Sequence, residues 1–332
     1  AGKFSQSDRM FFDRAGLEMA SGEDVAAYRA ARIGAVGVVA DLCCGIGGDL
    51  VALSAVNRVV GIDIDRTRVM IARLNSEVCS REPVGFAVAD ARLVNLRADL
   101  AFFDPARRGQ RSRTVRGSEY EPSLRLVQKL RQQVSNLVVK VSPAAPEEDL
   151  AEADEVAFVS AGGQCREATL YYGPLARSRR NAVVLPGPHV LEAEAAHNDE
   201  VEVAPAGRFL FDPDPAVVRA HLITELSRLL DAWKLSPFGA YLCGSHPVFS
   251  PFARTYKVLE SMPYGRKRVK QYLGAHSMRV LEIKKRGVTL DGDAELLHLK
   301  TPHGELAVSV VLERLERGIE AIICQRVLNS GD

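Results

Sequence analysis

Short apolar runs alternate with amphipathic stretches through the first half of the chain. Continuous runs of small apolar residues, typical of buried parallel strands, occur at residues 38–42 and 59–65. Residues 66–81 show helical spacing of Val69, Met70, Leu74 and Val78 after Asp65, a good helix cap. Further strands are predicted at residues 84–89, 100–103, 137–141, 156–160 and 168–172. This alternation predicts an α/β fold built on a parallel sheet.

A glycine-rich turn follows the first predicted strand, in Val38-Val-Ala-Asp-Leu-Cys-Cys-Gly-Ile-Gly-Gly-Asp49. Gly45 and Gly47 let the backbone turn tightly beneath a ligand. Asp63 in the next strand follows the turn at close to the ~20 residues that separate such a turn from a ribose-binding carboxylate. The layout predicts a nucleotide-binding βαβ unit.

The residues around this turn disfavour a dinucleotide. Leu50 occupies the position where close helix packing requires a third glycine, and Asp49 would face a pyrophosphate unfavourably. Asp41, before the turn, suits a ligand with a positive amino group, and S-adenosylmethionine carries both an ammonium and a sulfonium. A purely structural turn in some other α/β protein is the alternative.

With these motifs in order, residues 37–185 resemble a class I methyltransferase. The resemblance implies a doubly wound, seven-stranded Rossmann-like sheet and S-adenosylmethionine as cofactor, with S-adenosylhomocysteine as product. It implies that Asp63 binds the ribose and that Asp90, after the third strand, binds adenine. The full implied cofactor set is Asp41, Cys44, Gly45, Gly47, Asp63, Ile64, Asp90 and Ala91.

The turn also resembles the Asp-x-Phe-Cys-Gly-x-Gly-Gly signature of trimethylguanosine synthase and related RNA-modifying enzymes. This similarity favours an RNA substrate.

The fourth predicted strand ends in Asp104-Pro-Ala-Arg-Arg108. Amino-methylating families present an Asn or Asp, then Pro-Pro and an aromatic, to an extruded base. Asp104 and Pro105 retain half of this motif and are the candidate catalytic residues. Ala106 replaces the second proline, and Arg107 replaces the aromatic, although a guanidinium plane can also stack on a base. Carbon-5 methylation of a pyrimidine is disfavoured, because no cysteine nucleophile follows this strand or the next.

A run of arginines without an acid follows the candidate catalytic residues. Arg107 and Arg108 are the candidates for holding a phosphate or a base plane, and Arg111, Arg113 and Arg116 extend the run. A solvated loop that is basic by chance is the alternative.

Composition is that of an ordinary globular protein. The chain has 332 residues, 47% apolar content and a net charge of +1, which fits two or three domains. Its six cysteines form no Cys-x-x-Cys pair, so we expect neither a metal site nor a disulfide framework. We expect no membrane span and no signal peptide, and a reducing cytoplasm is the simplest location. Nothing in the sequence indicates an oligomeric state.

Four segments are predicted. Residues 1–34 form an N-terminal helical segment that covers the sheet or contributes a lid, residues 35–186 the cofactor-binding domain, residues 187–206 a linker, and residues 207–332 an α+β domain. In this last segment a short basic helix at 265–273 and the stretch Leu281-Glu-Ile-Lys-Lys-Arg-Gly-Val288 resemble the THUMP-like domain that follows bacterial methyltransferase domains. True THUMP domains bind tRNA-like structures, so the resemblance implies RNA by analogy.

Positive charge is concentrated in this last segment. Residues 254–286 contain ten Lys and Arg against Glu260 and Glu282, a local balance of +8. The candidate RNA-binding residues, interleaved with Tyr264 and Tyr272, are Arg266, Lys267, Arg268, Lys284 and Lys285. An ordinary solvated helix face is the alternative.

The sequence therefore predicts an S-adenosylmethionine-dependent methyltransferase that acts on a base in structured RNA, such as tRNA or rRNA. Two other functions remain open: a small-molecule methyltransferase whose arginines bind a substrate carboxylate, and a cofactor-binding RNA adaptor without turnover. The RNA, the nucleotide and the modified atom are not determined by the sequence.

Overall fold

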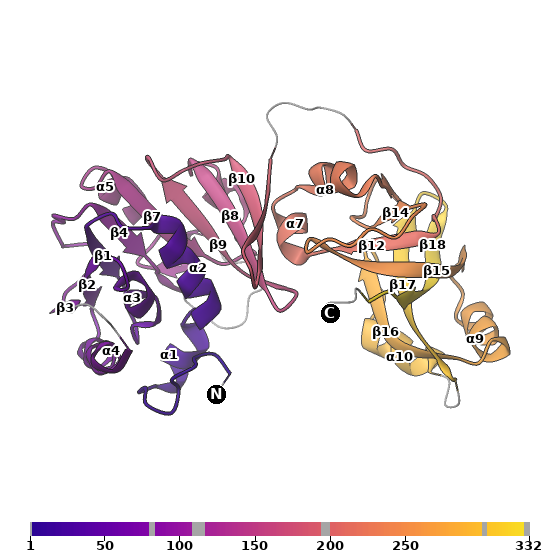
Figure 1. The fold of residues 1–332 in the computed structure, drawn as a ribbon, viewed down its shortest axis with the longest axis horizontal. Coiled ribbons are helices and arrows are strands. Elements are labelled where there is room, and N and C mark those ends of the chain that lie inside the picture. The colour runs from indigo at the N-terminus through magenta and orange to yellow at the C-terminus, as the bar shows by residue number, and fades with distance from the viewer. Residues whose placement is uncertain (1, 80–83, 108–116, 194–199, 301–303, 329–332) are drawn as a thin grey trace. The chain divides into compact units, whose positions relative to one another are not determined.

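A computed structural model describes residues 2–79, 84–107, 117–193, 200–300 and 304–328. The chain divides into two compact units, Ala1–Ala193 and Glu194–Asp332 (Figure 1).

The first unit is built on one large sheet. Among the described residues its strand order is β11-β10-β8-β9-β7-β4-β1-β2-β3. The strands are β1 Val38–Leu42, β2 Arg58–Asp63, β3 Val84–Val88, β4 Leu100–Phe103, β7 Asn136–Val141, β8 Glu155–Ala161, β9 Gln164–Tyr172, β10 Arg180–Leu185 and β11 His189–Glu192. The seven predicted strands are all present, and β9 lies antiparallel between β7 and β8.

The sheet has nine strands rather than the predicted seven. β10 pairs parallel with β8, and β11 folds back antiparallel on β10. The stretch Leu185-Pro-Gly-Pro188 has the composition of a linker but forms the turn between these strands, with Val184 paired to His189. Residues 182 and 183 are fully buried, because β10 packs against the apolar strand β8.

The described part of this unit has six α-helices: α1 Arg14–Met19, α2 Glu23–Ile33, α3 Gly48–Leu53, α4 Arg66–Cys79, α5 Leu126–Arg131 and α6 Glu147–Leu150. The backbone of Thr67 donates to the carboxylate of Asp65 at 2.8 Å, which confirms the predicted cap of α4. α2, α3 and α4 pack side by side (Figure 1). Leu50 and Leu53 of α3 join Val39, Phe102 and Val138 of the sheet in the core.

A small hairpin follows the fourth strand of the sheet. β5 (Ala106–Arg107) pairs antiparallel with β6 (Tyr120–Glu121), which follows the short 3-10 turn η1 (Gly117–Glu119). The pairing sets Tyr120 directly opposite Arg107.

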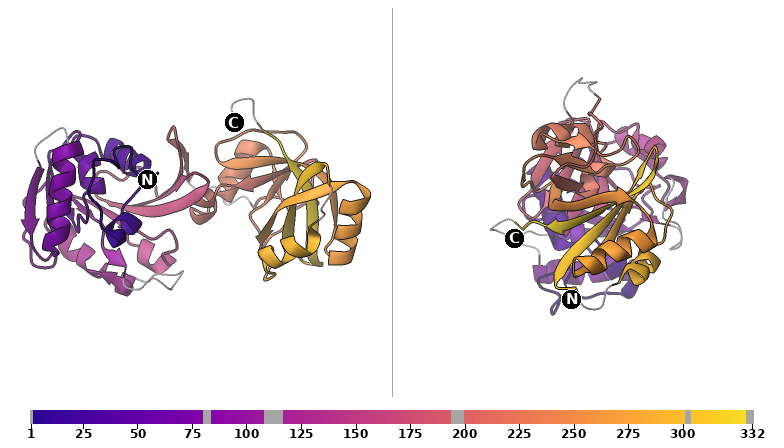
Figure 2. Two further views of the ribbon diagram at one scale, coloured as in Figure 1. Left: turned by 90° about the horizontal axis from the view of Figure 1, so that it is seen from below. Right: turned by 90° about the vertical axis from the view of Figure 1, so that its right-hand side faces the viewer.

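The second unit has a seven-stranded sheet among its described residues, in the order β13-β14-β12-β15-β18-β17-β16. Its elements are β12 Phe209–Pro213, α7 Pro215–Arg219, α8 Ile223–Leu230, β13 Trp233–Lys234, β14 Leu242–Gly244, β15 Ala253–Pro263, α9 Arg266–Ala275, β16 Met278–Arg286, α10 Gly292–Leu299, β17 Leu306–Leu315 and β18 Gly318–Arg326. Helices α9 and α10 pack together against β16 (Figure 2). Val269 and Leu273 of α9 are fully buried there, so the opposite side of the basic helix is exposed.

Candidate active site

A cleft of about 1310 Å³ opens where the carboxyl ends of β1, β2, β3, β4 and β7 meet. Doubly wound folds bind ligands at this edge of the sheet. The cleft is larger than the roughly 300–1,000 Å³ of ordinary ligand pockets, which leaves room for a donor and an acceptor. Most of the predicted site residues of the first unit line it, namely Cys44, Gly45, Asp63, Ile64, Asp90, Ala91, Asp104 and Pro105.

The glycine turn forms the floor of the cleft. Gly45 has a φ of +55°, and a Cβ added there would meet only the carbonyl oxygen of Cys43 at 3.9 Å, so the space above it is open. Gly47 has a φ of +86° and packs so closely on α4 that an added Cβ would lie 3.2 Å from the Cα of Ala72. Cys43 itself is left-handed, with a φ of +64°, a backbone conformation that glycine adopts with less strain.

Asp63 is tied to this turn. One of its carboxylate oxygens accepts from the backbone N–H of Gly45 at 3.0 Å and the other from the N–H of Asp65 at 2.9 Å. Its side chain is therefore held at the end of β2, at the lip of the cleft. Ile64, the next residue, is 65% exposed.

Asp90 lies in the same cleft beyond the end of β3. Its carboxylate forms an ion pair with Arg92 at 2.7 Å. Hydrogen bonds from the Arg92 side chain and backbone lower the pKa of Asp90, so the group is an anionic acceptor at neutral pH.

Asp41 lies on β1, beneath the turn, and is not among the residues that line the cleft. Its side chain is buried, and neither carboxylate oxygen has a hydrogen-bond partner among the described residues. Burial, reinforced by the negative charge of Asp104, raises the pKa of Asp41 to about 8. A buried acceptor without a donor is costly, and a cationic ligand group would remove that cost.

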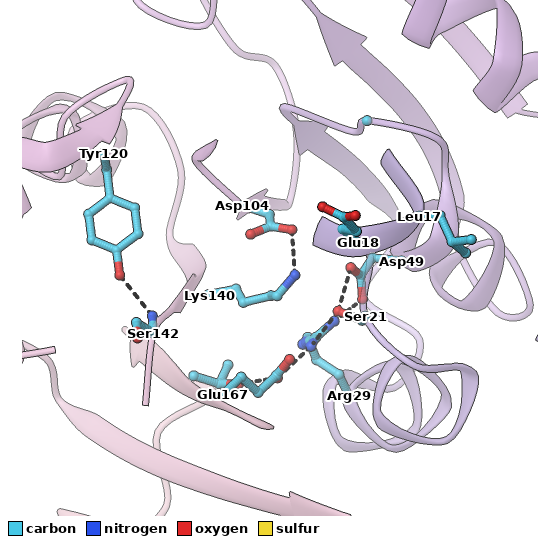
Figure 3. Close-up of polar contacts among 12 residues, drawn as sticks. Leu17, Glu18, Ser21, Arg29, Asp49, Asp104, Tyr120, Lys140, Ser142 and Glu167 are labelled. Atoms are coloured by element: carbon cyan, nitrogen blue, oxygen red, sulfur yellow. Dashed lines mark hydrogen bonds and ion pairs between the residues drawn. The ribbon is translucent and has the colours of Figure 1, made fainter. Parts of the chain in front are cut away.

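Directly after β4, Asp104 forms an ion pair with Lys140 in the cleft (Figure 3). The Lys140 Nζ donates to a carboxylate oxygen of Asp104 at 2.6 Å, and the two side chains are 13% and 27% exposed. Pro105, Ser142 and Tyr120 line the same end, and the backbone N–H of Ser142 donates to the Tyr120 hydroxyl oxygen at 2.8 Å.

The N-terminal segment forms one wall of the cleft through residues 2–5 and 18–25. Arg29 of α2 is buried and bonded to Asp49 of α3 and to Glu167 of β9 (Figure 3). The buried amide of Asn75 accepts from the N–H of Phe11 at 2.7 Å and donates to the carbonyl oxygens of Phe11 and Ile46 at 3.0 and 2.8 Å. The segment is thus fastened both to the glycine turn and to the sheet.

The predicted substrate-binding residues fall into three groups: those at the edge of the described residues, those in ion pairs and those that are exposed. The backbone of Arg107 belongs to β5, whereas its side chain and the whole of Arg108 lie outside the described residues. In the second unit, Arg266 is paired with Glu295, and Lys284 is half-buried and paired with Asp212 at 3.0 Å. Lys267, Arg268 and Lys285 are exposed.

Sequence reasoning missed two residues of the cleft. Lys140 is the single charged residue in the run Asn136-Leu-Val-Val-Lys-Val141, which was a readable signal. Tyr120 follows the arginine-rich stretch, and no motif in the sequence around it indicates a role in the site. It lies beside the segment after Asp104 because β5 pairs with β6.

Two curated relatives, from the CDC 1551 and H37Rv strains of Mycobacterium tuberculosis, are described as uncharacterized S-adenosylmethionine-dependent methyltransferases. Each is 34% identical to this chain over 331 residues, which cover 96% of the chain and 89% of the relative. The chain belongs to this methyltransferase family. The model of the THUMP domain-like family matches residues 253–326, from β15 to β18.

The fold of the methyltransferase has a counterpart among solved structures. A crystal structure described as a methyltransferase of Porphyromonas gingivalis W83 superposes with a TM-score of 0.78 at 20% identity, covering 96% of this chain and 83% of the other. This confirms the α/β fold class.

The residues of the cleft fit S-adenosylmethionine, which is the cofactor of this family. The open space above Gly45 and the carboxylate of Asp63 offer a cradle and an anionic group to a cationic nucleoside, and the buried, unpartnered Asp41 lies beneath them. When bound, the cofactor supplies an electrophilic methyl group. In the described part of the chain, no helix is long and apolar enough to cross a membrane. Among the same residues, no group of three or more His, Cys, Asp or Glu side chains is placed so that it could hold a metal ion.

Proposed function

We propose that this methyltransferase modifies an amino group of a base in structured RNA. The observation that carries the proposal is the exposed basic face of α9, inside the THUMP-like segment of a chain that also holds the methyl-transfer cleft. Within residues 266–275 there is no acidic residue, and Lys267, Arg268 and Lys270 are all exposed. Such a surface attracts RNA phosphates without reading sequence.

An aromatic pair supports contact with bases on the same helix. Tyr272 and His276 stack with their ring centroids 4.1 Å apart. His276 is exposed, whereas Tyr272 is partly buried against the core of the unit. Aromatic rings beside a phosphate-binding surface are typical of proteins that hold unstacked RNA. Of the predicted RNA-binding residues, Lys267, Arg268 and Lys285 carry the proposal, because Arg266 and Lys284 already have carboxylate partners.

The acceptor end of the cleft suits an amine as the group to be methylated. The amino nitrogen forms a bond to the methyl carbon as the carbon–sulfur bond breaks, and the excess proton on nitrogen must leave. Asp104 is the group that accepts this amino N–H and passes the proton to water. Methyl transfer of this kind depends mainly on orientation, so one well-placed acceptor is sufficient.

Mass spectrometry of nucleosides tests the proposal directly. RNA from cells with and without the gene should differ in one methylated nucleoside, and the purified chain should transfer tritiated methyl groups to RNA from the deletion strain. An unchanged nucleoside profile together with no transfer to that RNA would refute an RNA substrate. Transfer to a small carboxylate-bearing acceptor would instead identify a small-molecule methyltransferase.

A further inference from the structure

Lys140 occupies a position that a strand of the core would normally give to an apolar residue. β7 is central in the sheet, between β4 and β9, and Val138, Val139 and Val141 are buried. Lys140 lies one residue beyond Val139, which is paired with Phe103, and therefore beside Asp104 at the end of β4. Its side chain ends in the cleft rather than in the core.

The stability that the ion pair with Asp104 contributes does not explain why a lysine is present at position 140. Taking an ammonium and a carboxylate out of water costs about as much as their attraction returns, and apolar replacements of such pairs are often neutral or stabilising. The two side chains are also not sealed off, at 13% and 27% exposed, so both face the space in which the acceptor must lie.

The pair presents a hydrogen-bond acceptor beside a donor. Only one Asp104 oxygen receives Lys140, so the carboxylate has capacity for an incoming N–H. The Lys140 ammonium has three hydrogens and uses one of them on Asp104, which leaves two to donate. The matching ligand is an amino group next to an unprotonated ring nitrogen.

We propose that Lys140 is a specificity-determining residue that reads the ring nitrogen beside the amino group to be methylated. This inference rests on the proposed action on an RNA base. Adenine, cytosine and guanine each carry an exocyclic amino group next to such a nitrogen, whereas uracil has none. Asp104 accepts from the amino group, Lys140 donates to the ring nitrogen, and together they fix the base plane in front of the methyl group.

Lys140→Met tests this assignment, since it keeps most of the length of the side chain and removes the donor. The substrate is RNA from the deletion strain, and the readout is kcat/KM for tritiated methyl transfer. We expect a loss of about 10- to 100-fold, the range for removing a charged hydrogen-bond donor, with partial recovery in Lys140→Arg. Titration calorimetry should show that S-adenosylmethionine binds Lys140→Met as it binds the unmodified enzyme, which separates this effect from misfolding.

A modified RNA distinguishes reading of the base from support of Asp104. In a transcript whose target base carries C–H in place of the ring nitrogen, the unmodified enzyme should lose about the same factor, and Lys140→Met should lose nothing further. Equal losses in both enzymes, full activity of Lys140→Met, or a methyl group found on uridine would each overturn the assignment. Absence of any transfer to RNA by the unmodified enzyme would overturn the proposed function as well. A methyl group on uridine would overturn its amino-group acceptor but not the RNA substrate, and the other two outcomes leave the proposed function intact.

Discussion

Single residues at the cleft hold conformations and charge states that only a ligand site explains. Cys43 is left-handed, Asp41 is buried without a partner, and Asp63 is held by two backbone donors. Each lies within or next to the glycine turn, and the first two depart from what stability alone would select. Strain of this kind concentrates at functional sites.

Cys43→Gly should stabilise the protein. A left-handed non-glycine residue costs about 1–2 kcal/mol, so we expect the free energy of unfolding to rise by roughly 1 kcal/mol in urea titrations. Cys43→Ala is the matched control, because it removes the thiol but keeps the Cβ that causes the strain. Equal stabilisation by both variants would mean that the thiol, rather than the backbone, is responsible.

Asp41→Asn should stabilise the ligand-free protein, and the gain should grow with pH. The pKa of Asp41 is raised to about 8 from 3.8, so between these values the unfolded chain is ionised while the folded protein stays protonated. Folding stability from this group therefore falls as pH rises through that window. Thermal unfolding at pH 5 and pH 8 should show a larger advantage of Asn at pH 8, and an advantage that is constant across pH would contradict the raised pKa.

The same variant should weaken binding of S-adenosylmethionine if its ammonium is the partner of Asp41. Binding to an ionised Asp41 must then release a proton below pH 8, so the affinity of the unmodified protein should increase from pH 6 to pH 8. Calorimetry in two buffers of different ionisation enthalpy measures that proton. No proton release would remove Asp41 from the cofactor site.

Asp63→Ala should abolish measurable cofactor binding in calorimetry. The carboxylate is the predicted ribose partner, and it also orders the turn through the N–H of Gly45. Asp65→Ala is the control, since Asp65 caps α4 from an exposed position two residues away. It should cost about 1 kcal/mol of stability and leave cofactor binding intact.

At the scale of elements, the N-terminal helices line the cleft of the candidate active site. α2 packs on α3, and Arg29 joins α2 to Asp49 and Glu167, which are distant in sequence. A burial as complete as that of Arg29 requires that both carboxylates stay bonded. The wall of the cleft therefore depends on one guanidinium.

Arg29→Met should destabilise the protein strongly. Removing one member of a buried charge network leaves Asp49 and Glu167 without their cation, and such changes cost about 3–5 kcal/mol. Urea unfolding measures this loss. Arg14→Ala is the control: its pair with Glu18 is exposed, at 93% and 51%, and its removal should cost under about 0.5 kcal/mol.

At the scale of the whole molecule, the chain joins a methyltransferase unit to a unit with a THUMP-like segment. Lys267, Arg268 and Lys270 of the second unit are exposed on one face of α9, because α9 uses Val269 and Leu273 for its packing. Catalytic and RNA-binding functions are thus proposed for separate units of one chain.

The triple variant Lys267→Ala, Arg268→Ala and Lys270→Ala should weaken RNA binding without changing cofactor affinity. If each cation contacts a phosphate, the slope of log affinity against log salt should become shallower by about 2. Filter binding at several salt concentrations measures both quantities. Arg14→Ala removes one cation from the first unit and is the comparison for the loss of a single charge outside α9. A triple variant with unaltered RNA binding and an unaltered salt slope would exclude α9 as the RNA surface.

The sequence by itself determined the strands β1 to β4, the helix α4 with its cap, the glycine turn and the order of the acids along the sheet edge. These features are local: apolar periodicity, backbone freedom at glycine and capping act over a few neighbouring residues. These features also carried the resemblance that implies S-adenosylmethionine as cofactor. The carboxyl ends of parallel strands meet at one edge of the sheet, so the acids that follow the strands were expected to lie together there.

Only the tertiary structure decided which side chains meet. Lys140 and Asp104 are 36 residues apart, and Arg29 and Glu167 are 138 apart, so no local pattern could pair them. The same holds for the basic residues of the second unit. Lys284 forms an ion pair with Asp212 and Arg266 with Glu295, whereas Lys267 and Arg268 are exposed. The sequence shows which residues are charged or polar, but tertiary packing determines which of them contact one another. The chemistry of this site depends on those contacts.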